Sequence, residues 1–420
     1  MKVEVQELGA RGDGIAGPAG AEVYIPYSVP GDVLEVKLKG KQARISQVLE
    51  PSEHRQQPAC RHFTRCGGCA LQHVKADFYA DWKRQQVMTA LSHRGFEDVE
   101  ILDPVTSPPG SRRRTRLNAI GRGKGKAILG FSEKGSHNLI DLQECPVLRP
   151  EIVALIPALR DFLGQVIELR QKMAVEITAA DNGLDLLLES KGDPSLDLRM
   201  DVAAFAEARD IARISWRDTS LKRAAPEMLL ERRQPIVTFA GRKILIPPGT
   251  FLQATREGEA ALISRLLPHL KEGGKLVDIF AGVGTFSVPA LKKMAVHALE
   301  GNAEMVEALQ KSVNLAPLQH PFSAEVRDLF IRPFLAHELE GFDIAVIDPP
   351  RAGAREQVAE LAASSVPVIV MVSCNPATFA RDARTLADGG YHMGPVTPVD
   401  QFLWSSHLEV VSVFSRSSHF

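Results

Sequence analysis

The sequence has no apolar run of 18 residues, and its opening residues (Met-Lys-Val-Glu-Val-Gln-Glu) contain no apolar signal segment. A membrane-spanning helix requires about 20 predominantly apolar residues, so none is predicted. Neither charge is in excess, because 50 Lys and Arg face 51 Asp and Glu, and net charge therefore gives no sign of a polyanionic partner. We expect a soluble, cytoplasmic, monomeric protein that does not bind membranes.

Cysteine is also scarce, with five residues in 420. Five unevenly spaced cysteines argue against the disulfide scaffold of a small secreted protein. Four of them have a spacing that resembles a metal site, namely Cys60, Cys66, Cys69 and Cys145. Zinc prefers two tight pairs, whereas an iron–sulfur cluster tolerates a five-residue gap and a distant fourth ligand. The spacing favours a cluster, with zinc and unrelated thiols as the alternatives.

The fifth cysteine, Cys374, follows an apolar run rich in β-branched residues at 366–373. Such a run predicts a buried parallel strand with the thiol at its carboxyl end. Ligands of open α/β sheets bind in the crevice outside these ends, so Cys374 is a candidate nucleophile. A core thiol is an equally good interpretation of this stretch, because free cysteine is among the most buried residue types.

The pattern of apolar residues divides the chain into three parts. Short alternating runs separated by glycines predict a small OB-like barrel at 1–52, which is either an RNA-binding or a structural module. Several β-type runs and two helical segments predict a mixed α/β domain at 53–245, which contains the cysteine cluster. Helices then alternate with strands through 246–420, which predicts a doubly wound parallel sheet and the catalytic domain.

A glycine-containing loop, Asp278-Ile-Phe-Ala-Gly-Val-Gly-Thr-Phe286, follows the first strand of that sheet. Gly282 permits a tight turn close to a ligand, and Glu300 ends the next strand, where it can accept hydrogen bonds from ribose hydroxyls. A dinucleotide fingerprint would have a third glycine where this chain has Ser287, which disfavours nicotinamide and flavin cofactors. The loop and Glu300 suit S-adenosylmethionine as well as NAD.

The motif Asp348-Pro349-Pro350 ends a later apolar strand, and its two prolines hold the aspartate at the crevice edge. Methyltransferases that act on exocyclic amines have a similar motif followed by an aromatic residue. Here Arg351 follows instead, and an amino-methyltransferase has no use for a nucleophilic thiol. That function is therefore the weaker alternative.

A basic run lies in the middle domain: residues 105–126 contain seven Lys and Arg and no acidic residue. Such a run is typical of a surface that contacts phosphates, or of a solvated face. A non-enzymatic RNA-binding protein would account for this run and for the barrel. It would leave the glycine-containing loop and Cys374 without a role.

Taken together, the motifs resemble the RNA (uracil-5-)-methyltransferase family, in particular its 23S rRNA-modifying branch. Thr285 stands where relatives often have Asn, and Ser111 where an aromatic residue often precedes the arginines. The resemblance covers nearly the whole chain and rests on Pro30-Gly31-Asp32 in a TRAM-like barrel, Cys66-Gly67-Gly68-Cys69, Gln72-His73, Tyr79 to Lys83, Arg112 to Leu117, Phe251-Leu252-Gln253, Asp278 to Phe286, Asp348 to Gly353, Ser373-Cys374-Asn375-Pro376 and His407-Leu408-Glu409.

The resemblance implies a class I, Rossmann-like methyltransferase domain that uses S-adenosylmethionine to methylate the 5-carbon of a uridine, in 23S rRNA or alternatively in tRNA. It implies a covalent cysteine–uracil intermediate, with Cys374 as the nucleophile and Glu409 as the general base. Without it, Glu409 would be interpreted as a surface charge. It also implies that the four clustered cysteines ligate a [4Fe–4S] cluster. The implied contacts to S-adenosylmethionine or the target base are Gln253, Phe280, Thr285, Glu300, Asp328 and Asp348.

Overall fold

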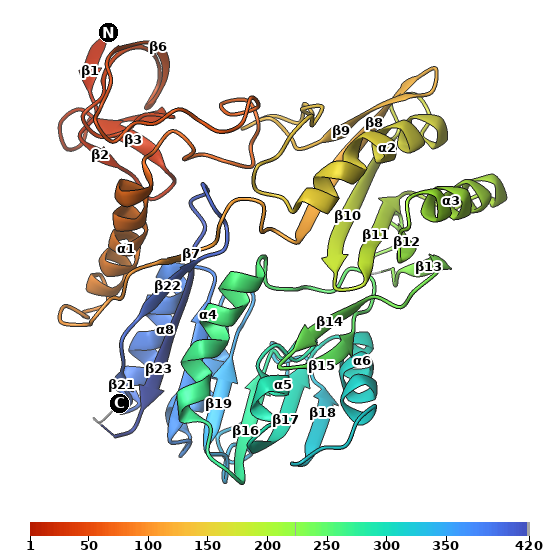
Figure 1. The fold of residues 1–420 in the computed structure, drawn as a ribbon. Coiled ribbons are helices and arrows are strands. Elements are labelled where there is room, and N and C mark those ends of the chain that lie inside the picture. The colour runs from red at the N-terminus through yellow and green to blue at the C-terminus, as the bar shows by residue number, and fades with distance from the viewer. Residues whose placement is uncertain (223, 418–420) are drawn as a thin grey trace.

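The computed structural model describes residues 1–222 and 224–417. Figure 1 shows a curled N-terminal sheet, a central sheet with helices beside it, and a large C-terminal sheet with helices on its faces. None of the helices in the described residues combines the length and apolarity that a membrane crossing needs.

The N-terminal sheet has six strands in the order β1-β5-β6-β4-β3-β2. They are β1 (Lys2–Glu4), β2 (Glu7–Leu8), β3 (Asp13–Ala16), β4 (Val23–Pro26), β5 (Val33–Lys39) and β6 (Gln42–Glu50). β1 pairs with β5 and β2 pairs with β3, so the first stretch of the chain joins the two edges and closes the sheet (Figure 1). Val5, Ile25 and Leu34 are buried inside it.

The central sheet has the order β13-β12-β11-β10-β8-β9 and is antiparallel except between β11 and β12. Its strands are β8 (Arg114–Gly123), β9 (Lys126–Gly130), β10 (Lys172–Ala180), β11 (Gly183–Ser190), β12 (Arg213–Asp218) and β13 (Glu227–Glu231). The helices α2 (Pro150–Val166) and α3 (Leu196–Ala208) share an apolar core with it. α3 connects β11 to β12, which explains their parallel pairing.

The C-terminal sheet has nine strands in the order β18-β17-β16-β19-β20-β23-β22-β7, with β21 paired to β23. They are β7 (Val105–Thr106), β16 (Gly274–Ile279), β17 (Met294–Glu300), β18 (Phe322–Val326), β19 (Ile344–Ile347), β20 (Val368–Ser373), β21 (His392–Met393), β22 (Thr397–Asp400) and β23 (Glu409–Ser415). From β18 to β20 the strands are parallel, whereas β23 is antiparallel to its neighbours. With β16 counted as the first strand and β7 and β21 left out, the order is 3-2-1-4-5-7-6.

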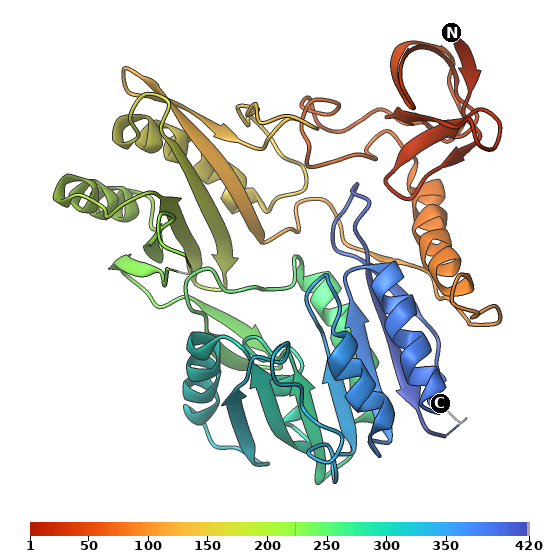
Figure 2. The ribbon, with the colours of Figure 1, turned by 180° about the vertical axis from the view of Figure 1, so that it is seen from behind.

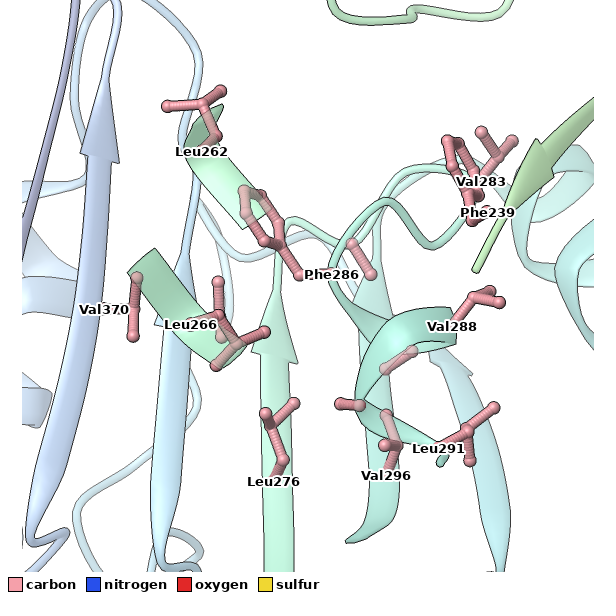
Figure 3. Packing of buried hydrophobic residues seen from close by; sticks show 14 of the residues in the cluster. Phe239, Leu262, Leu266, Leu276, Val283, Phe286, Val288, Leu291, Val296 and Val370 are labelled. Carbon is pink, nitrogen blue, oxygen red and sulfur yellow. The ribbon is translucent and has the colours of Figure 1, made fainter. Parts of the chain in front are cut away.

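Both faces of this sheet are buried, which is the pattern that its continuous apolar runs predict. On one face, Leu276 and Val370 pack against Leu262 and Leu266 of α4 and against Phe286 (Figure 3). Neighbouring residues along each strand point to the opposite core. The flanking helices are α4 (Arg256–Leu266), α5 (Ser287–Ala290), α6 (Ala303–Asn314), α7 (Arg355–Ala363) and α8 (Pro376–Asp388).

The packing differs from the three-part division expected from the sequence. α1 (Ala76–Ser92) lies beside α8, as Figure 2 shows in orange and blue, and β7 joins the edge of the C-terminal sheet. The hairpin of β14 (Ile236–Phe239) and β15 (Arg242–Leu245) also contributes to the C-terminal core. Residues 76–106 and 236–245 therefore pack with the C-terminal sheet, because their apolar faces are buried there.

α4 stops at Leu266 and a 3-10 turn, η1 (Leu267–His269), follows. Pro268 explains this end, because proline has no N–H to donate to the helix ladder.

A buried ion pair anchors α1 to the C-terminal sheet. Lys83 Nζ lies 3.2 Å from an oxygen of Asp400, and both side chains are fully buried. Tyr79 donates a second hydrogen bond to Asp400 at 2.6 Å, and Lys83 also bonds the backbone carbonyl of His407. These bonds connect the helix to the β22–β23 loop.

We expect Lys83→Met to lower the free energy of unfolding by about 3–5 kcal/mol, because it leaves the Asp400 charge buried without its partner. Urea denaturation measures this loss. The matched control is Arg384→Met, which breaks the exposed pair with Asp388 and should cost less than about 1 kcal/mol. Equal losses in the two variants would contradict the anchoring role.

Candidate active site

The candidate residues of the catalytic domain lie at one edge of the C-terminal sheet. Parallel strands end at the same edge, and polar residues follow each of these ends. The loop at 280–286 follows β16, Glu300 ends β17, Asp328 lies beyond β18, Asp348 follows β19 and Cys374 follows β20. The strand order reverses direction between β16 and β19, and open α/β sheets bind ligands at such a point.

Glu409 reaches this edge from the opposite strand direction. β23 is antiparallel to β20, and Ser373 is the register partner of Val410. Cys374 is the residue after Ser373, and Glu409 is the residue before Val410. Antiparallel pairing therefore sets the thiol opposite the carboxyl, although 34 residues separate them in the sequence.

The Glu409 carboxyl is buried, with 3% of the residue exposed. Its Oε2 atom has no hydrogen-bond partner in the described part of the chain. Burial raises the pKa of Glu409 to about 8, the negative charge of Asp348 raises it as well, and a hydrogen bond from Gln401 opposes both. A carboxyl with a free buried oxygen and a pKa near neutrality suits a group that accepts a proton.

Asp348 has a similar environment. Gln253 Nε2 donates a hydrogen bond to its Oδ2 at 2.8 Å. Burial raises the pKa of Asp348 to about 7, and the buried carboxyl of Asp278 adds to this shift. Asp278 itself is held by Ser287 Oγ at 2.6 Å. The crevice therefore contains a row of carboxyl groups whose charged forms are disfavoured together.

Gln401 is a site residue that the sequence did not indicate. Its amide nitrogen donates to Gln253 Oε1 at 2.6 Å, and its oxygen accepts from the backbone N–H of Ala254 at the same distance. Nothing in the sequence marks a glutamine that follows an edge strand as functional. Only its position between Gln253 and Glu409 does.

The Cys374 thiol is half-buried and lines a cavity of about 530 Å³. Burial raises the pKa of Cys374 to about 11, the charges of Glu409 and Asp348 raise it further, and Arg351 lowers it. The thiol is thus largely protonated before substrate binds. Side chains that line the same cavity include Cys60, Cys66, Cys69, Arg112, Cys145, Arg351, Phe402 and His407.

The loop that follows β16 has an open concave side. Phe280 and Gly282 have positive φ angles of 67° and 56°, and a Cβ at Gly282 would meet no atom within 4 Å. Glu300 accepts the backbone N–H of Gly282 at 3.0 Å, which fixes the loop against the end of β17. Close backbone approach to a ligand is possible here, as S-adenosylmethionine binding requires.

Comparison with known proteins gives consistent results. Residues 330–417 match the family model described as tRNA (Uracil-5-)-methyltransferase. An uncharacterised RNA methyltransferase of Caulobacter vibrioides is 42% identical over 98% of this chain and 99% of its own. The 23S rRNA (uracil(1939)-C(5))-methyltransferase RlmD of Pectobacterium atrosepticum is 31% identical over 99% of this chain and 93% of its own.

The chain belongs to the RNA (uracil-5-)-methyltransferase family. It is an enzyme that methylates the 5-carbon of uracil in RNA with S-adenosylmethionine as methyl donor. A solved structure agrees: the tRNA (uracil-54, C5)-methyltransferase of Pyrococcus abyssi, in complex with S-adenosyl-L-homocysteine, has a TM-score of 0.77 and 25% identity, with 99% of each chain covered. The α/β methyltransferase fold expected from the sequence is confirmed.

The basic run of the methyltransferase is divided between two roles. Arg113 is buried, bonds the Gln253 carbonyl at 3.0 Å and pairs with Glu259, so it supports the fold rather than RNA. Arg114 and Arg116 pair with acidic residues of neighbouring strands. No acidic partner is found among the described residues for Arg112, Arg122, Lys124 and Lys126.

The four clustered cysteines of the methyltransferase line the cavity that contains Cys374. Backbone N–H groups are directed at their sulfurs, for example from His62 to Cys60 and from Gly68 to Cys66, each at 3.4 Å. Such bonds favour thiolates, as metal ligation requires. Within residues 1–222 and 224–417, however, no three Cys, His, Asp or Glu side chains are arranged to hold a metal ion.

We expect the rate of Cys374 alkylation by iodoacetamide to keep rising with pH beyond about pH 10, since the pKa of the Cys374 thiol is raised to about 11. Glu409→Gln should accelerate alkylation roughly 2- to 10-fold at about pH 9, because it removes a negative charge that stabilises the thiol. This difference should shrink below about pH 8, where Glu409 is protonated.

Mass spectrometry of the peptide that contains Cys374 measures this rate separately from the other cysteines. Arg351→Gln is the opposing control and should slow alkylation, because the Arg351 charge lowers the pKa of the thiol. Faster alkylation in Arg351→Gln, or no change in either variant, would show that these charges do not act on the thiol.

Proposed function

We propose that this enzyme methylates a uridine of 23S rRNA through a transient covalent bond between Cys374 and the target base, with Glu409 as the general base. One observation carries the proposal: the register of β20 and β23 places the thiol opposite a buried carboxyl that has a free oxygen. A nucleophile and a base at the same crevice are what the chemistry of the 5-carbon needs.

The 5-carbon of uracil is too weak a nucleophile to accept a methyl group directly. The Cys374 sulfur forms a bond to the 6-carbon, and the electron pair of the 5,6 double bond becomes an enolate with negative charge at the 5-carbon. Bound S-adenosylmethionine would supply the methyl group to the 5-carbon, with cleavage of its sulfur–methyl bond and S-adenosylhomocysteine as the leaving group. Glu409 then removes the remaining proton from the 5-carbon, the double bond forms again and the sulfur leaves.

The raised pKa of Cys374 works against the first of these steps. The thiol must lose a proton before it adds to the ring, and the negative charges of Asp348 and Glu409 oppose this loss. Sulfur still suits the step, because thiolates are intrinsically nucleophilic and leave readily. A nucleobase inside a folded RNA cannot reach the Cys374 thiol, so the target uridine must be flipped into the cavity.

The RNA contacts belong to the proposal as well. We infer that the closed N-terminal sheet is a TRAM-like RNA-binding barrel. Together with it, the basic residues without acidic partners would hold phosphates around the flipped uridine. These include Arg112, which lines the cavity, and the exposed Arg122 and Lys126 of β8 and β9. Binding should therefore weaken with salt concentration.

Ribosomal RNA is favoured over tRNA by likeness in sequence. The relative named for 23S rRNA is 31% identical, whereas the solved structure named for tRNA is 25% identical. The second candidate target remains tRNA, because the matching family model carries its name.

We further propose that Cys60, Cys66, Cys69 and Cys145 hold a [4Fe–4S] cluster. Their soft thiolate ligands, the N–H bonds to their sulfurs and the cavity between them support it. A cluster is larger than a single ion, so its ligands need not converge on one point. A [4Fe–4S] cluster at this position would connect residues 60–69 to Cys145 and complete the wall of the cavity.

We expect Glu409→Gln to accumulate a covalent, methylated protein–RNA adduct, because the sulfur cannot leave until the proton at the 5-carbon is removed. Turnover should fall on the order of 100-fold or more. Denaturing gels with labelled RNA measure the adduct, and Cys374→Ala is the control that should form none. Normal turnover of Glu409→Gln without an adduct would reject the assigned role.

The same adduct identifies the target. RNA trapped on Glu409→Gln from a total RNA extract should be a 23S rRNA fragment when sequenced. A trapped tRNA would retain the mechanism and overturn the proposed target.

We expect anaerobically purified enzyme to contain about four iron atoms per chain and equal sulfide. Cys66→Ser should lose both, whereas Cys374→Ala should retain both, because Cys374 is not a ligand in this proposal. Iron and sulfide assays measure the difference. Stoichiometric zinc in the purified wild-type enzyme would refute the cluster.

A further inference from the structure

Two amide side chains connect the two carboxyl groups of the crevice. Gln253 donates to Asp348 at 2.8 Å and Gln401 donates to Gln253 at 2.6 Å. The Gln401 amide also lowers the pKa of Glu409 through a side-chain hydrogen bond. Gln253 and Gln401 are 3% and 1% exposed, so water does not substitute for these bonds. We call this arrangement the amide relay.

A backbone group fixes the polarity of the relay. The N–H of Ala254 donates to Gln401 Oε1 at 2.6 Å, and a backbone N–H can only donate. The oxygen of Gln401 must therefore face Ala254, and its NH₂ group must face Gln253 Oε1. Gln253 in turn directs its own NH₂ group to Asp348. Rotation of Gln401 by half a turn would place two oxygens together at one contact and two donors at the other.

The fixed polarity has a consequence for both carboxyl groups. Asp348 and Glu409 each receive an N–H donor, and hydrogen bonds donated to a carboxylate favour its ionised form. Burial and mutual repulsion act in the opposite direction. The relay thus opposes the tendency of the crevice to neutralise the group that must accept a proton.

Other charged groups face this region from each neighbouring element. Asp348, which follows β19, raises the pKa of Glu409, and Glu409 in turn raises the pKa of Cys374, which follows β20. Asp278 of β16 raises the pKa of Asp348. Arg351 acts on Cys374. On the α1 side, Lys83 is neutralised by Asp400.

We propose that Gln401 is a positioning residue, which holds the Glu409 carboxyl and the Gln253 amide so that Glu409 stays ionised when it removes the proton from the 5-carbon. The inference rests on the proposed role of Glu409. It assigns a function to a residue whose neighbour, Asp400, is anchored to Lys83 of α1.

The test measures adduct resolution in a single turnover, with enzyme in excess over RNA and S-adenosylmethionine present, from about pH 6 to about pH 10. Quenching in detergent separates the covalent adduct from released, methylated RNA. In Gln401→Leu, which lacks the donor, the pH of half-maximal resolution should rise by about one unit. Resolution should then be roughly tenfold slower below that pH and near the wild-type rate above it.

The matched control is Gln357→Leu. Gln357 is also 1% exposed, but both of its bonds go to the backbone of Phe334, at 2.7 and 2.9 Å, away from the crevice. It should lose stability as Gln401→Leu does and keep the wild-type pH profile. Should Gln401→Leu fail to fold, Gln401→Glu keeps the acceptor for Ala254 and removes the donor when ionised, and it should raise the midpoint as well.

A wild-type midpoint in a folded Gln401 variant would overturn the inference while leaving the proposed function in place. Equal shifts in Gln401→Leu and Gln357→Leu would show a general structural effect and would also overturn it. Absence of any adduct, in Glu409→Gln as well, would overturn the proposed function and this inference with it.

Discussion

The site depends on the antiparallel pairing of β23 with β20 inside an otherwise parallel part of the sheet. All parallel strands deliver the residues after their carboxyl ends to one edge, and only a reversed strand brings its first residue there. Glu409 is that first residue. A shift of β23 by one residue would turn Glu409 to the other face, because successive side chains alternate. Both faces carry apolar cores, so burial holds this register.

The crevice collects carboxyl groups where burial disfavours their charge, and the surrounding structure must hold them in place. Asp278, Asp348 and Glu409 all have raised pKa values, mainly because of burial. Donors from Ser287, Gln253 and Gln401 act against this effect. The buried Lys83–Asp400 pair supports the same crevice, because it holds the end of β22, which Gln401 follows directly. Rigid support of this kind keeps catalytic groups ready without reorganisation.

The β22–β23 loop is where the separate parts of the molecule meet. The carbonyl of Trp404 accepts hydrogen bonds from the backbone of Ala70 and Leu71, next to the clustered cysteines. Leu403 packs in an apolar cluster with Leu8 of the N-terminal sheet, and Phe402 lines the cavity that contains Cys374. The segment that contains Cys60, Cys66 and Cys69, the closed N-terminal sheet and β23 are therefore all connected to the β22–β23 loop. That arrangement explains how segments far from Cys374 in sequence form the wall of the cavity that it lines.

The sequence alone determined the fold class and most of the candidate site, because apolar periodicity specifies a strand locally and the polar residue after each strand marks the reactive edge. Cys374, Asp348 and Glu300 could be predicted as site residues in this way. Strand order and register, the burial of Arg113, the position of Gln401 and the packing of α1 on the C-terminal sheet were decided only by the tertiary structure. Each of these depends on contacts between residues far apart in the chain, and local pattern carries no information about which distant partner a side chain will meet.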